Sequence, residues 1–127
     1  MNEDFVTYEL AVKLKERGFN CMYPIAMYNE RGVFHELYTS VGNMQYYDYD
    51  DFDERDTIAP TISQVLTWLR EEKKIYLEIV IVVDAEYMCD IYKINPRPIE
   101  CLGSTEYFKT YEQAALAGVN YCLENLI

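Results

Sequence analysis

The sequence predicts an α+β fold: a largely antiparallel sheet of four or five strands, with three helices gathered mainly on one face. Three segments carry apolar residues at three- and four-residue spacing, which is typical of helices with one buried side. Two further segments pair apolar runs across short turns, which indicates hairpins. The order is helix, hairpin, helix, hairpin, helix (α-β-β-α-β-β-α). Because 127 residues is the length of one ordinary domain, we expect a single domain over residues 1–127.

The first helix is expected within residues 3–19. Phe5, Tyr8 and Val12 recur at helical spacing, and acidic residues precede basic ones along the segment, which matches the helix dipole. Gly18 is a natural stop, because glycine accepts the left-handed backbone that ends many helices.

The first hairpin is expected over residues 20–28 and 33–40, joined by a turn that ends at Gly32. Proline has no N–H to donate to a neighbouring strand. Pro24 therefore predicts that the first strand lies at the edge of the sheet.

The second helix and hairpin follow an acidic connection. Pro60 suits a first helical turn, and the helix is expected to end near Lys73. Ile75–Val83 is the most strand-like segment and is expected to be central in the sheet, because it is rich in β-branched residues. Residues 84–86 form its turn. The expected helical stripe comprises Ile62, Val65, Leu66 and Leu69, with Trp68 at its margin.

The C-terminal part contains a third helix. Residues 95–107 hold two prolines and a glycine, and leave open a fifth strand near residues 99–102. Thr110 followed three residues later by Gln113 predicts a capping box at the start of the helix. The expected buried face comprises Ala115, Val119, Cys122 and Leu126.

The net negative charge of the chain disfavours several classes of partner. A net charge of -11 and a pI near 4.4 disfavour direct nucleic-acid binding and attachment to anionic membranes. The longest apolar run, Ile79–Val83, is five residues, whereas a spanning helix needs about 20. The N-terminus has no signal-peptide pattern, so we expect a cytoplasmic protein with reduced, mostly buried thiols. Its cysteines are Cys21, Cys89, Cys101 and Cys122.

Motifs for metals, cofactors and catalysis do not occur. An EF-hand loop beginning at Asp48 or Asp51 fails on ligand register, which leaves only weak, nonspecific cation binding. His35 is the single histidine, and we expect a structural or partly exposed ring. Nucleophile-elbow and phosphate-loop motifs are missing from the sequence. We therefore predict no metal, no cofactor and no catalytic residues.

The segment "MQYYDYDDFDERD", residues 44–56, is the strongest candidate for recognition. Aromatic side chains beside carboxylates suit protein contacts. In the alternative, Tyr47, Tyr49 and Phe52 cover the core while the aspartates face water. The candidate protein-binding residues are Tyr46, Tyr47, Asp48, Tyr49, Asp50, Asp51, Phe52 and Asp53.

Two segments carry a resemblance: "APTISQVLTWLREEKKIYLEI" (59–79) and "KTYEQAALAGVNYCLENLI" (109–127). They resemble short, acidic, uncharacterised proteins encoded in Bacteroidetes genomes, often in phages, prophages or other mobile elements. The shared motifs are helical stripes and caps. The resemblance implies a genomic context, with no activity and no functional residues to carry over.

These observations favour a noncatalytic protein of phage or mobile-element type that binds another protein. The partner is unknown, and a second copy of the chain, forming a homodimer, is one such partner. The supporting features are an open sheet face, thirteen tyrosines and the acidic aromatic segment. The alternatives are an acidic DNA-mimic inhibitor of a nucleic-acid-binding protein and, third, a small enzyme.

Overall fold

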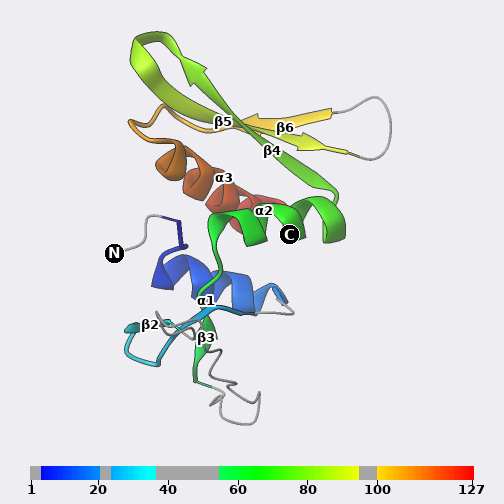
Figure 1. Ribbon diagram of the computed structural model, residues 1–127. Helices are drawn as coiled ribbons and strands as arrows, with labels where there is room; N and C mark the ends of the chain where they lie inside the picture. The colour runs from blue at the N-terminus through cyan, green and yellow to red at the C-terminus, as the bar shows by residue number, and fades with distance from the viewer. Residues whose placement is uncertain (1–3, 21–23, 37–54, 95–99) are drawn as a thin grey trace. The chain divides into compact units, whose positions relative to one another are not determined.

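The computed structural model describes residues 4–20, 24–36, 55–94 and 100–127. These residues form three α-helices and two three-stranded antiparallel sheets (Figure 1). Contacts divide the chain into an N-terminal unit, Phe5–Thr61, and a C-terminal unit, Met1–Asp4 with Ile62–Ile127. The α+β class is confirmed. The prediction of a single sheet of four or five strands is not confirmed, because the described strands form two sheets. The single domain stays a prediction.

In the N-terminal unit, α1 (Tyr8–Glu16) is defined by its caps. The Thr7 hydroxyl accepts a hydrogen bond from the backbone N–H of Leu10, which satisfies a donor that the first turn leaves free. Gly18 follows the helix with a φ of +83°, and its N–H donates to the carbonyl of Lys15. The predicted glycine stop is therefore confirmed.

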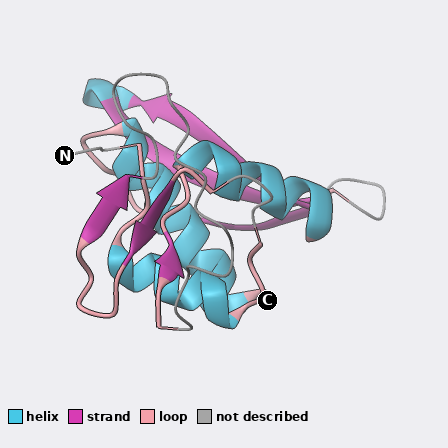
Figure 2. Ribbon diagram, turned by 60° about the horizontal axis from the view of Figure 1, so that its bottom comes forward, coloured by secondary structure: helices cyan, strands magenta, loops and turns pink. Residues whose placement is uncertain are grey.

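The sheet of this unit has the order β2-β1-β3, seen side by side in Figure 2. Its strands are β1 (Ala26–Tyr28), β2 (Phe34–Glu36) and β3 (Thr57–Ile58). The prediction that the first strand lies at the edge is wrong, because β1 pairs on both sides. Pro24 precedes β1 by two residues, so its missing N–H falls outside the ladder.

The helices of the C-terminal unit are α2 (Ile62–Glu72) and α3 (Tyr111–Asn125). Pro60 lies before α2 rather than in its first turn, and its carbonyl accepts the N–H of Val6. At α3 the predicted capping box is confirmed. The Thr110 side chain accepts from the Gln113 N–H, and the Gln113 side chain accepts from the Thr110 N–H.

The second sheet has the order β4-β5-β6, with β4 (Ile75–Val82), β5 (Glu86–Lys93) and β6 (Glu100–Ser104). The prediction that Ile75–Val83 is central is wrong, because β4 is an edge strand and β5 is central. Composition reflects what covers the faces of a strand, whereas position in the sheet depends on which strands pair with it. The strand that the sequence left open near residues 99–102 is present in the structure as β6 (Glu100–Ser104).

Both helices of the C-terminal unit lie on one side of this sheet (Figure 1). A Cβ added to Gly118 would stand 2.5 Å from the Sγ of Cys89 and 3.3 Å from the Cδ1 of Leu77. The α3 backbone therefore packs directly against the sheet face that these two side chains occupy. Buried residues of α2 are Ile62, Val65, Trp68 and Leu69; those of the sheet are Ile75, Leu77, Cys89 and Ile91; those of α3 are Ala114, Ala115, Gly118, Val119, Cys122 and Leu123.

Candidate functional site

The residues predicted from sequence as the recognition site, Tyr46 to Asp53, lie outside the described residues. The described residues offer a polar pocket in the N-terminal unit and two solvent-facing surfaces on the β4–β5 hairpin.

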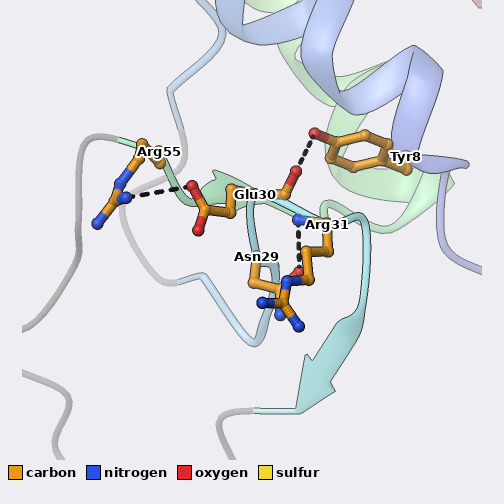
Figure 3. Close-up of polar contacts among 5 residues, drawn as sticks. All are labelled: Tyr8, Asn29, Glu30, Arg31 and Arg55. Atoms are coloured by element: carbon orange, nitrogen blue, oxygen red, sulfur yellow. Dashed lines mark hydrogen bonds and ion pairs between the residues drawn. The ribbon is translucent and has the colours of Figure 1, made fainter.

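The polar pocket lies at the turn between β1 and β2 and has a volume of about 230 Å³. Its lining comprises Asn29, Glu30, Arg31, Arg55 and Asp56. The Arg55 Nη1 lies 3.2 Å from the Glu30 Oε2, and both side chains are more than half exposed (Figure 3). Two guanidinium groups and two carboxylates balance in charge, and exposed ion pairs contribute little energy.

Local hydrogen bonds hold the turn beside this pocket. The Asn29 Oδ1 accepts from the backbone N–H groups of Arg31, at 2.8 Å, and Val33, at 3.0 Å. The Tyr8 hydroxyl donates to the Glu30 carbonyl at 3.3 Å (Figure 3). Gly32 has a φ of +78°, which glycine adopts without strain. The pocket therefore has one wall fixed by local hydrogen bonds.

Metal-binding and thiol chemistry receive little support from the described residues. Among them, no three His, Cys, Asp or Glu side chains gather as metal ligands, and His35 is exposed on β2. Burial raises the pKa of both Cys89 and Cys122 to about 12, so both thiols stay protonated at neutral pH. Cys101 is exposed. The expectation of buried thiols is thus confirmed for two of these three cysteines.

One of the two surfaces on the β4–β5 hairpin is the face of β4 and β5 turned away from α3, here called the uncovered face. Side chains alternate along a strand, so this face holds the residues between those that contact α3. Its cross-strand pairs are Tyr76 with Tyr92, Glu78 with Asp90, Val80 with Met88, and Val82 with Glu86.

Polar contacts connect the centre of the uncovered face. The Ser104 hydroxyl donates to the Asp90 Oδ1 at 2.6 Å. Desolvation, and after it the negative charges of Asp90 and Glu78, raise the pKa of Tyr92.

The second surface is at the turn of the same hairpin and is here called the hairpin-end surface: Ile81, Val83, Tyr87 and Tyr111. Ile81 and Val83 are 69% and 82% exposed. Tyr87 is the cross-strand partner of Ile81, and its ring contacts that of Tyr111 at a centroid distance of 6.4 Å. Reciprocal backbone bonds between Tyr87 and Phe108, both 2.7 Å, tie the hairpin to the segment before α3.

Comparisons with protein-family models, with curated proteins and with solved structures found no match. No helix among the described residues is long and apolar enough to cross a membrane.

Sequence reasoning missed the hairpin-end surface, although one signal was present. The apolar run Ile79–Val83 continues without alternation up to the turn at Asp84. A strand with one buried face needs apolar residues only at every second position. Apolar residues at consecutive positions beside a turn are therefore the pattern that identifies this surface.

Proposed function

We propose that this chain is a noncatalytic protein-binding protein, and that its hairpin-end surface contacts the partner. The observation that carries the proposal is the exposure of Ile81 and Val83, 69% and 82%, on an ordered hairpin. Apolar groups gain about 25 cal/mol for each Å² removed from water. Clustered exposed apolar and aromatic side chains are typical of protein-binding surfaces.

The position of these side chains supports the proposal. On the helix-facing side of β4, Ile75 and Leu77 are 4% and 7% exposed, whereas Ile81 is 69% exposed. The first two stabilise the fold by burial. Ile81 contributes little to that core, so a binding role accounts for an apolar residue there better than folding does.

Recovery of host proteins by affinity capture tests the proposal. The Ile81→Thr/Val83→Thr variant keeps β-branched shape while adding polarity. It is expected to lose at least one protein that wild type recovers reproducibly, while the control Val33→Thr retains it. Val33 is a suitable control because it is also an exposed valine, at 48%. Identical recovery by all three proteins would contradict the proposal.

The acidic aromatic segment is a second element of the proposed interaction. Tyr46 to Asp53 combine aromatic rings and carboxylates, a composition suited to protein recognition. Changing its acids to Asn and Ser is expected to reduce recovery of the same partner. Unchanged recovery would remove this segment from the proposal. The resemblance to phage and mobile-element proteins favours a host protein as the partner.

A DNA-mimic inhibitor is the alternative function, favoured by the net charge of -11 and by Glu78, Glu86 and Asp90 on the uncovered face. It requires competition with duplex DNA for one basic protein. Recovery that excess duplex DNA does not reduce would exclude this alternative and leave the protein-binding proposal standing.

A further inference from the structure

The uncovered face has a feature that the fold does not require. Glu78 and Asp90 stand directly opposite each other on β4 and β5. Like charges at directly opposed positions destabilise a sheet. Ser104 donates a hydrogen bond to Asp90, and among the described residues no ion pair involves either carboxylate. Residues that break a local rule in this way often mark functional positions.

Apolar and aromatic side chains surround this charge pair on the same face. Tyr76 and Tyr92 form the next cross-strand pair on one side, and Val80 and Met88 form it on the other. Tyr76 is 45% exposed. Both helices of the C-terminal unit lie on the opposite side of the sheet (Figure 1). The face thus presents two carboxylates between a tyrosine pair and an aliphatic pair.

This arrangement is complementary to one kind of side chain. A guanidinium group is planar, carries a permanent positive charge, bonds carboxylates through a fork of N–H groups, and stacks on aromatic rings. Its aliphatic stem can pack on apolar neighbours. Aspartate or glutamate from a partner would meet repulsion instead.

We propose that the uncovered face binds an arginine side chain of a protein partner. Its guanidinium lies between Glu78 and Asp90, and the partner residues next to this arginine pack on the flanking tyrosine and aliphatic pairs. This inference rests on the proposed protein-binding function and names the chemistry of the partner. The arginine brings the positive charge that the opposed carboxylates lack.

A small probe tests this inference without the natural partner. The probe is a capped five-residue peptide with a central arginine flanked by valine and threonine, and backbone amide NMR signals report where it binds. The largest shifts are expected in β4 and β5 around Glu78 and Asp90. A peptide with citrulline in place of arginine keeps the shape without the charge and is expected to bind at least about tenfold more weakly.

Matched variants separate a specific site from general attraction to an acidic protein. The Glu78→Gln/Asp90→Asn variant is expected to weaken arginine-peptide binding at least about tenfold, because it removes both charges and keeps both shapes. The control Glu16→Gln/Glu72→Gln removes the same charge from exposed helical positions and is expected to change binding less than about twofold. Equal weakening by both variants, or shifts that map elsewhere, would overturn the inference.

Thermal unfolding provides an independent readout. If the pair serves binding at the expense of the fold, Glu78→Gln/Asp90→Asn melts at a higher temperature than wild type. A lower melting temperature would show that the pair stabilises the fold and would count against the inference. If wild type does not prefer the arginine peptide, but Ile81→Thr/Val83→Thr still fails to capture the partner, only the arginine site is rejected. If wild type does not prefer the arginine peptide and that variant captures the same proteins as wild type, the proposed function is rejected as well.

Discussion

The two faces of the β4–β5 hairpin are built from alternate residues of the same strands, yet they differ in composition and burial. The helix-facing side is apolar and closely packed, down to the contact between Gly118 and Cys89. The uncovered face carries opposed carboxylates between tyrosine and aliphatic pairs. Packing explains the buried residues of the first set, though not the exposed Ile81 at the hairpin end, and it explains the second set hardly at all. Residues that packing does not explain are where function is best sought.

The comparison is sharpest within β4, where one substitution can be made at both ends of the helix-facing side. Ile75→Ala is expected to lower the free energy of unfolding by about 2–5 kcal/mol, because Ile75 is 4% exposed. Ile81→Ala should cost less than about 1 kcal/mol, because its side chain is already largely in water. Chemical denaturation of the two variants measures the difference. Equal losses would mean that Ile81 belongs to the core.

The close approach of α3 to the sheet predicts the next largest effect. Gly118→Ala places a methyl group against the Cys89 Sγ. Overpacking typically costs about 1–3 kcal/mol, and the better helix propensity of alanine returns about 1 kcal/mol. We expect a net loss of stability in denaturant titrations.

Removing the clashing sulfur provides the control for that prediction. In Gly118→Ala/Cys89→Ala the loss is expected to be smaller than the sum of the two single losses, because the new methyl group occupies space that the sulfur leaves. Additive losses would contradict a direct contact between these positions.

The buried thiols on the packed side predict a pH dependence. Burial raises the Cys122 pKa from 9.0 to about 12, so the unfolded chain releases a proton above pH 9 that the folded chain retains. The contribution of the buried thiol to the free energy of unfolding is therefore fully present below about pH 9. It falls as the pH rises toward 12, by up to about 1.4 kcal/mol per pH unit for each such thiol.

Urea unfolding at pH 8 and pH 10, with reductant present, measures this slope. Cys122→Ala is expected to reduce the fall in stability between the two pH values. Cys101→Ala serves as the control, because Cys101 is exposed, and it should leave the fall unchanged. If both variants match wild type, the buried thiol is not the source of the pH dependence.

The smallest expected effect is on the uncovered face, and its sign is opposite. Glu78→Gln removes one of two opposed negative charges and is expected to raise the free energy of unfolding by about 0.2–1 kcal/mol. Glu72→Gln, an exposed change at the end of α2, should stay within about 0.5 kcal/mol of wild type. Destabilisation by Glu78→Gln would mean that the carboxylate contributes to the fold.

Elements that depend on neighbouring residues were predictable. The capping box of Thr110 and Gln113, the stop at Gly18 and the turn ending at Gly32 all follow from chemistry within a few residues. The helical stripe of α2 was also predicted closely, although Trp68 is buried and was expected at its margin. Local sequence determines such features because the interacting atoms are only one to four residues apart.

The sequence by itself thus determined the α+β class, the presence of three helices, the capping box of Thr110 and Gln113, and the stop at Gly18. Only the tertiary structure decided that β1 and β5 are central, that the described strands form two sheets, and that Ile81 and Val83 remain exposed while Ile75 is buried. These features depend on pairing and coverage by residues distant in the chain. An apolar residue has the same local preference whether or not a helix later covers it, so its exposure becomes known only when the packing is known.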